Sequence, residues 1–189
     1  SEKRLNASDE EGGVVYLKSK VNDNISVEPY YIYKKEDPVG ANKALKLNTL
    51  GARAVFTASG GWRVRGEFAR QFGSYDNSID RKANGGYLFA GRKYENVGLK
   101  PEWELGYVYL SGNDRGTASD HEGWNPLFSR APLWNELYIY TLISETAGDG
   151  GALPGYWTNL YLLKFGVKLA LASATTLTLS GQYLKADQN

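Results

Sequence analysis

The segment Gly61–Phe72, GWRVRGEFARQF, alternates between apolar and charged side chains along most of its length. The even-numbered positions carry Trp62, Val64 and Phe68, and the odd-numbered positions carry Arg63, Arg65 and Glu67. Because successive side chains of a β-strand point to opposite faces, this alternation predicts a strand with one apolar face and one charged face. The fold therefore depends on whether the charged face contacts bulk water, a partner or the interior of a barrel.

The composition of the 189-residue chain suits β-structure and excludes several kinds of site. Its 14 Tyr, 5 Trp and 22 Gly are typical of strands, amphipathic rings and turns. The charge is nearly balanced, with 22 Lys and Arg against 21 Asp and Glu, so it does not indicate a nucleic-acid partner. The chain has no Cys and a single histidine, His121, which cannot supply a His-rich metal site. We therefore expect no metal and no cofactor.

Similar alternation recurs along the chain and predicts about eight strands. They lie near residues 13–19, 25–33, 47–58, 61–72, 85–94, 101–112, 159–171 and 175–185. The facing of the fifth of these, GGYLFAGRKY, stays open, because its apolar and small residues do not alternate clearly. Many of these segments approach the roughly 9–11 residues that cross a bilayer at a tilt.

The connections between the predicted strands also alternate in length. Short connections are expected near residues 20–24, 59–61, 95–100 and 172–174, and long ones near 34–46, 73–84 and 113–154. Outer-membrane barrels have tight turns at one end and long loops at the other, whereas a soluble sandwich has no need of this sorting. We therefore predict an all-β fold, an antiparallel up-and-down transmembrane β-barrel. Residues 1–189 would form a single barrel domain or a segment of one.

The longest connection, at about 113–154, is predicted to be an extracellular loop that folds over or into the barrel mouth. Within it, residues 131–145 fit either a ninth strand or a short helix, and we interpret them as ordered structure inside the loop. Residues 112–123, GNDRGTASDHEG, offer oxygen ligands but lack the ligand order of an EF-hand. We interpret them as a solvated loop in which His121 is exposed.

Inside a barrel, the charged strand faces would line a wet lumen, because the lipid-facing side must be apolar. The predicted pore-lining residues are Arg53, Arg63, Arg65, Glu67, Glu102, Glu104, Lys164 and Lys168, with Glu28 as a further anion. Rings of side-chain charge set selectivity in water-filled pores, so clustered cations predict a preference for anionic solutes. Alternatively, these charges pair with each other and only stiffen the wall. Arg70 falls on the apolar parity, where its long side chain could reach the membrane interface. The scattered carboxylates do not indicate an enzyme, and we predict no catalytic residues.

Two motifs support a resemblance to a known family. Residues 107–114 read Tyr-x-Tyr-x-Ser-Gly-Asn-Asp, and residues 123–130 read Gly-Trp-Asn-Pro-Leu-Phe-Ser-Arg. This region, Trp103 to Leu160, resembles the alginate-export family of Gram-negative outer-membrane barrels. The resemblance implies a large monomeric barrel with an Arg-rich constriction for an acidic polysaccharide. Eight strands alone enclose an interior that side chains fill, so we expect the chain to be a segment of a longer one.

The sequence thus predicts a porin-like channel of the bacterial outer membrane that passes or exports anionic solutes, with an acidic polysaccharide such as alginate as one candidate. Its expected partners are outer-membrane lipid and an anionic small solute or polysaccharide, not nucleic acid, and the oligomeric state stays open. One alternative is a structural or adhesive barrel that transports nothing. Another is a soluble β-sandwich that binds carbohydrate on Trp124, Trp134 and Trp157.

Overall fold

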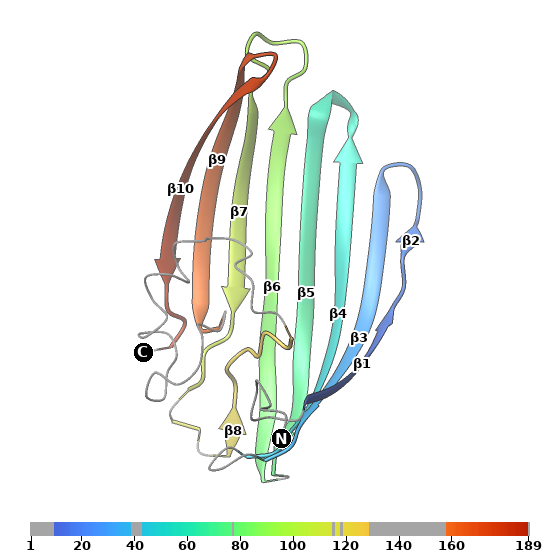
Figure 1. Cartoon of the computed structure of the whole chain (residues 1–189), viewed down its shortest axis with the longest axis vertical. Helices are drawn as coiled ribbons and strands as arrows, with labels where there is room; N and C mark the ends of the chain where they lie inside the picture. Colours follow the sequence, from blue (N-terminus) through green and yellow to red (C-terminus); the bar gives the residue numbers. More distant parts are fainter. Residues whose placement is uncertain are drawn as a thin grey trace, which may run out of the picture.

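The computed structural model describes residues 10–38, 43–76, 78–114, 116–117, 119–128 and 158–188. Their strands form a single, mainly antiparallel sheet, which we call the wall (Figure 1). The elements are β1 Glu10–Tyr16, β2 Ser19–Lys20, β3 Ile25–Glu36, β4 Leu45–Ala58, η1 Ser59–Gly61, β5 Trp62–Tyr75, β6 Ile79–Lys93, β7 Glu102–Leu110, β8 Asp120–His121, β9 Leu160–Ala172 and β10 Thr175–Lys185. None of the described residues forms a helix that is long and apolar enough to cross a membrane.

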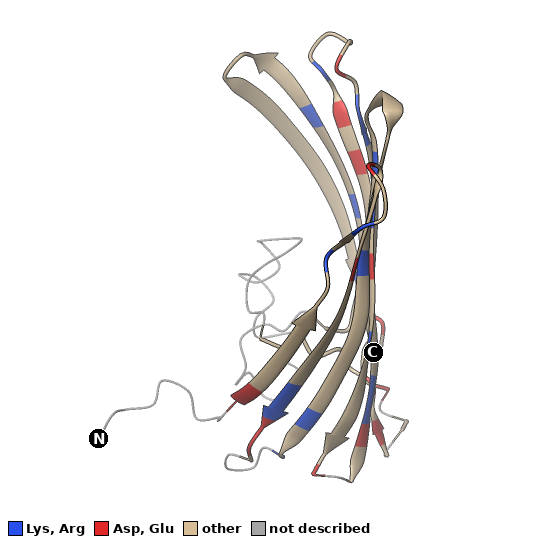
Figure 2. Ribbon diagram, turned by 90° about the vertical axis from the view of Figure 1, so that its right-hand side faces the viewer, with Lys and Arg blue, Asp and Glu red and all other residues tan. Residues whose placement is uncertain are grey.

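The long strands follow each other in the sheet in the order β1-β3-β4-β5-β6-β7-β9-β10. The short strands β2 and β8 pair with β3 and β6, and only the β6–β8 pair is parallel among those described. Seen from its edge, the sheet is a curved wall, and β1 and β10 stand at its two ends (Figure 2). The predicted all-β antiparallel fold with about eight strands is confirmed, and the open sheet is consistent with part of a larger barrel.

The two faces of the sheet differ, as alternate residues of β5 show. Phe68 and Phe72 are 61% and 43% exposed, whereas Ala69 and Gln71 are 2% and 0% exposed. We call the first side the apolar face, and it carries further exposed side chains on neighbouring strands, namely Leu50, Leu88, Leu105, Leu163 and Leu179. The opposite side is the charged face, defined by Arg53, Arg65, Glu67, Glu104 and Lys164. An apolar face of this extent is suited to lipid.

The core of the described chain lies on the charged face of β6, β7 and β9. It consists of Phe89, Val108, Leu110, Leu160 and Leu162. Trp124 packs against this cluster from residues 119–128, which we call the inward segment. The buried side chains therefore gather where the chain after β7 folds back onto the wall.

Two of the three predicted long connections are shorter than expected. The strand β5 continues to Tyr75 and β6 begins at Ile79, so the loop expected at 73–84 is only a turn at 76–78. Gly, Ser, Asp and Asn in this region are typical of loops, but backbone pairing continues through them, with Ser74 opposite Asp80. The connection expected at 34–46 shrinks to 37–44. Of the three connections predicted to be long, only the one from 111 to 159 is long, so the predicted sorting of loop lengths was partly wrong.

Candidate functional site

The structure brings all the predicted pore-lining residues to one side of the sheet. Through strand register, the charged face carries Arg53 on β4, Arg63, Arg65 and Glu67 on β5, Glu102 and Glu104 on β7, and Lys164 and Lys168 on β9. Figure 2 marks the basic and acidic positions along the strands. The placement agrees with the predicted facing, while the pore-lining role stays a prediction.

One row of this face is a chain of charged and phenolic groups across β3, β4 and β5. Glu28 lies opposite Arg53, which lies opposite Glu67. The Arg53 Nη1 donates to Glu28 Oε2 at 2.8 Å, and the Tyr30 hydroxyl donates to Glu67 Oε1 at 2.5 Å. The Tyr16 hydroxyl donates to the Glu28 carboxylate as well. Both carboxylates of this row are therefore held by donors, which fixes their positions on the wall.

A second contact joins β5 to β7 across the intervening strand. Arg65 Nη2 lies 3.0 Å and 3.1 Å from the two carboxylate oxygens of Glu104. On β6, Gly91 lies opposite Glu104, so no side chain separates the pair at that position. The Arg65 guanidinium also stands over the Phe89 ring, 4.4 Å from its centroid. The Arg65 side chain remains 33% exposed, so its charge is still accessible from the charged face.

Two other cations of the charged face have no such partner among the described residues. Arg63 and Lys168 are exposed and make no hydrogen bond or ion pair within the described residues. Lys93 differs, because its Nζ lies 2.6 Å from Glu95 Oε1 in the turn after β6, and this ammonium lowers the pKa of the Glu95 carboxyl. The alternative in which the charges only pair with each other thus fits Arg53 and Arg65 but not Arg63 or Lys168.

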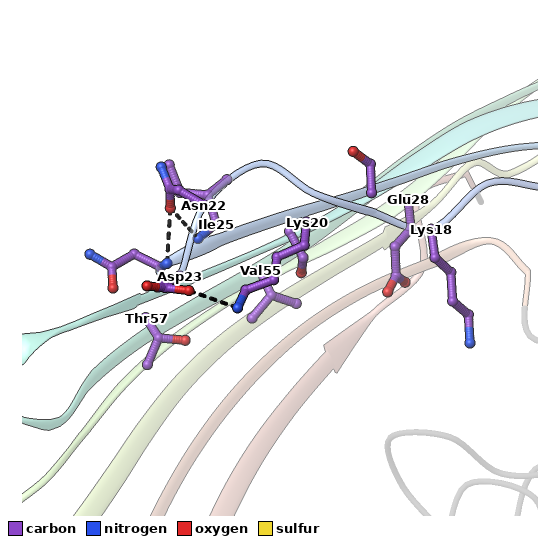
Figure 3. Close-up of a pocket in the computed structure, with 11 residues that line it drawn as sticks. Lys18, Lys20, Asn22, Asp23, Ile25, Glu28, Val55 and Thr57 are labelled. Atoms are coloured by element: carbon purple, nitrogen blue, oxygen red, sulfur yellow. Dashed lines mark hydrogen bonds and ion pairs between the residues drawn. The ribbon is translucent and has the colours of Figure 1, made fainter.

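A shallow cleft extends the charged face beside the turn between β2 and β3 (Figure 3). Its lining includes Lys18, Lys20, Glu28 and Thr57. Lys20 Nζ lies 2.7 Å from Asp23 Oδ1, so this ammonium is already paired. The cleft adds hydroxyl and ammonium groups next to the row that contains Glu28.

The inward segment is fastened to the charged face by polar side chains of the wall. Gln71 Nε2 donates to the Asn125 carbonyl at 2.7 Å, and Lys34 Nζ donates to the Leu127 carbonyl at 2.9 Å. Arg81 Nη2 donates to the Gly123 carbonyl at 2.7 Å. These wall side chains are Lys34, Gln71 and Arg81, at 1%, 0% and 2% exposure. A polar group buried this deeply is costly unless it is hydrogen-bonded, so the wall and the segment depend on each other.

Glycines of the wall make room for aromatic rings. A Cβ atom on Gly85 would lie 2.7 Å from Trp124 Cε3, and a Cβ atom on Gly12 would overlap the Phe128 ring. Gly51 is covered by Tyr30 and Gly106 by Phe89 in the same way. These glycine–ring contacts could not be predicted from the sequence, because a glycine within a strand does not reveal which ring will cover it.

Two sequence interpretations of the region after β7 were wrong. His121 is half-buried in β8, lies opposite Arg81 in a parallel pair, and contacts the side chain of that arginine. Its ring also meets the Tyr75 ring edge-on, with centroids 5.5 Å apart. The region is thus not simply a solvated loop, because Asp120 and His121 join the sheet as β8 and Gly112 and Gly123 are buried. Trp124 faces the wall and is not an open sugar platform, and the other two proposed platforms lie outside the described residues, as do residues 131–145.

The family follows from a match over nearly the whole chain. A family model described as alginate export matches residues 6–186. The chain belongs to the alginate export family. The resemblance found at residues 103–160 is therefore confirmed and extended. No curated protein matches the chain in sequence. Membership in the alginate export family agrees with the antiparallel wall and its apolar face, and it places the fold among outer-membrane β-barrels of a transport family. The sandwich alternative does not agree with this membership.

Proposed function

We propose that this chain forms part of the wall of an outer-membrane channel that exports an anionic polysaccharide, and that its charged face lines the lumen. The observation that carries this proposal is the gathering of Arg53, Arg63, Arg65, Lys164 and Lys168 on the face opposite the apolar one. Side-chain charges that line a water-filled pore set its selectivity. Cations in this arrangement would attract the carboxylates of a uronic-acid polymer such as alginate.

The carboxylates of the same face favour movement of such a polymer through the lumen rather than tight binding to the wall. Glu104 contacts Arg65, and Glu28 contacts Arg53, so part of the cationic charge is already balanced. Conduction requires binding that is favourable enough for entry and weak enough for exit. In this proposal Arg63 and Lys168 provide exchangeable contacts, and the paired arginines form the fixed background of charge.

The connection from 111 to 159 is proposed to lie on the extracellular side, because outer-membrane barrels have their short turns on the periplasmic side. At its beginning, the inward segment rests on the charged face, where Gln71 and Arg81 hold it. A segment in this position would narrow the lumen. This supports a loop that restricts access from outside.

The selectivity of the full-length protein in planar bilayers tests the proposal. In an Arg63→Ser/Arg65→Ser variant, the reversal potential in a salt gradient should shift toward cation preference, because the positive potential of the lumen falls. The matched control is Arg92→Ser, which removes a cation from the apolar face of β6 next to Trp62 and should leave selectivity unchanged. An equal shift in both variants would contradict the assignment of Arg63 and Arg65 to the lumen and of Arg92 to the apolar face. A folded barrel that conducts no ions would favour the structural or adhesive alternative.

A further inference from the structure

The apolar face contains an arginine that none of the described residues neutralises. Arg70 is exposed on β5, opposite Leu50 on β4 and Asn84 on β6. Its neighbours on the same face of β5 are Phe68 and Phe72, at 61% and 43% exposure. Arg70 makes no hydrogen bond or ion pair within the described residues. A cation on a face suited to lipid requires an anionic partner or contact with the polar headgroup layer.

A second unpaired cation lies on the same face. Lys46 is exposed on β4 and also has no hydrogen bond or ion pair in the part of the chain that the structure describes. Two other lysines near Arg70 and Lys46 are neutralised by carboxylates. Lys35 lies 2.9 Å from Asp37 and 3.7 Å from Glu11. Lys82 lies 3.0 Å from Asp120 and 3.3 Å from Asp80. The uncompensated charge of this region of the apolar face is thus concentrated at Arg70 and Lys46.

Aromatic residues indicate the depth of these cations in the membrane. Trp62 and Trp103 meet edge-on at the opposite end of the sheet, with ring centroids 5.6 Å apart. Ten residues separate Trp62 from Phe72. That corresponds to about 34 Å along a strand and, at a tilt of about 40°, to about 26 Å across the membrane. The apolar band of an outer-membrane barrel is about 25 Å tall and is flanked by aromatic girdles. Arg70 is two residues before Phe72, about 5 Å inside this edge of the band at the same tilt, so its long side chain can extend to the headgroup level.

We propose that Arg70 and Lys46 bind the phosphates of lipid A, the phosphorylated glycolipid of the outer leaflet. Arginine binds phosphate through paired N–H donors, and cations at this depth recognise lipid headgroups. Lys46 is four residues from Leu50, about 14 Å along β4, and Leu50 is opposite Arg70. Two cations at this spacing suit a disaccharide headgroup with a phosphate on each sugar. The exposed Leu50, Phe68 and Leu88 offer apolar surface to its acyl chains.

The choice of leaflet rests on the proposed function, because it places the connection from 111 to 159 outside the cell. Arg70 and Lys46 lie toward the end of the sheet at which this connection leaves β7 and returns to β9. The inference does not depend on transport. If the full-length barrel conducts anions but does not bind lipid A, the proposed function is supported and this inference is contradicted.

Native mass spectrometry of the full-length protein in detergent, titrated with purified lipid A, tests the site. The wild-type protein should bind lipid A at least about tenfold more tightly than an Arg70→Ser/Lys46→Ser variant, a difference of about 1.4 kcal/mol. The matched control is Arg92→Ser on the same face at the other end. There Arg92 Nε donates to the Gly60 carbonyl at 2.9 Å, and its guanidinium lies 4.5 Å from the Tyr94 ring centroid. This variant should bind lipid A as the wild-type protein does.

A second set of titrations varies the ligand and uses only the wild-type protein. Lipid A stripped of its phosphates, phosphatidylglycerol and inorganic phosphate should each bind the wild-type protein at least about tenfold more weakly than intact lipid A. Equal binding of phosphatidylglycerol would show a general anionic-lipid site and overturn the assignment to lipid A. Equal binding of the dephosphorylated lipid, or unchanged binding in the double variant, would overturn the role of Arg70 and Lys46.

Discussion

Gln71 on β5 and Asn125 in the inward segment hold each other through two hydrogen bonds, although they are 54 residues apart in the chain. The Gln71 side-chain amide donates to the Asn125 carbonyl at 2.7 Å and accepts from the Asn125 N–H at 2.9 Å. Gln71 is fully buried on the charged face, at 0% exposure. A single wall side chain therefore satisfies both backbone groups of a residue that lies in front of the wall.

Replacing Gln71 with leucine should release the inward segment from the wall. Both backbone groups of Asn125 would lose their partner, and a buried polar group left unpaired costs about 1–3 kcal/mol. Limited proteolysis of the folded full-length protein should then cut within residues 113–128, while the strands stay protected.

The control for this variant is Thr49→Val. Thr49 lies opposite Gln71 and is buried, and its hydroxyl makes no hydrogen bond among the described residues. The change should leave the cleavage pattern as in the wild-type protein. If Gln71→Leu protects residues 113–128 as well as the wild-type protein does, the two hydrogen bonds do not hold the segment.

Adding a methyl group at Gly85 should displace Trp124. The new Cβ would lie 2.7 Å from Trp124 Cε3, which is closer than carbon atoms approach, so the ring must move away from the wall. We expect Gly85→Ala to raise the single-channel conductance, because the inward segment would leave the charged face. The control is Gly13→Ala on β1, where a Cβ atom meets nothing within 4 Å. Unchanged conductance in Gly85→Ala would argue against a narrowing role for the segment.

Adjacent residues of β5 should respond oppositely to a change of charge. Phe68 is 61% exposed on the apolar face, so Phe68→Arg should impair insertion by about 2–4 kcal/mol, the cost of arginine at the midplane of a barrel's lipid face. Glu67→Gln, one position away on the charged face, keeps an oxygen acceptor for the Tyr30 hydroxyl and should insert normally. Folding into lipid vesicles, followed by heat-modifiable electrophoretic mobility, measures both. A harmless Phe68→Arg together with a damaging Glu67→Gln would mean that the facing is inverted.

Cell fractionation tests the location that the family and the apolar face indicate. The full-length protein should be found with the outer membrane and should need detergent for extraction, since the exposed leucines and phenylalanines of the apolar face require lipid or detergent cover. Recovery of the protein in salt buffer without detergent would contradict the barrel.

Much of the candidate site could be predicted from the alternation of residues along single strands. Arg63, Arg65 and Glu67 were assigned to one face without knowledge of any neighbouring strand, since side chains two residues apart share a face. The ends of β5 and β6 were less predictable. Polar residues such as Ser74 and Asp80 are typical of loops, yet they pair across the strands, and only the register shows that pairing.

The sequence by itself thus determined the strand type, the shared facing of the predicted pore-lining residues and, through its motifs, the family. It did not determine which charges meet. Arg65 reaches Glu104 across β6, 39 residues further along the chain, because Gly91 leaves the space between them open. Nor did it determine that Trp124 covers Gly85 or that Gln71 binds Asn125. Alternation is a local property with a period of two residues, whereas register and the docking of a distant segment depend on packing between residues far apart in the chain, which only the tertiary structure decides.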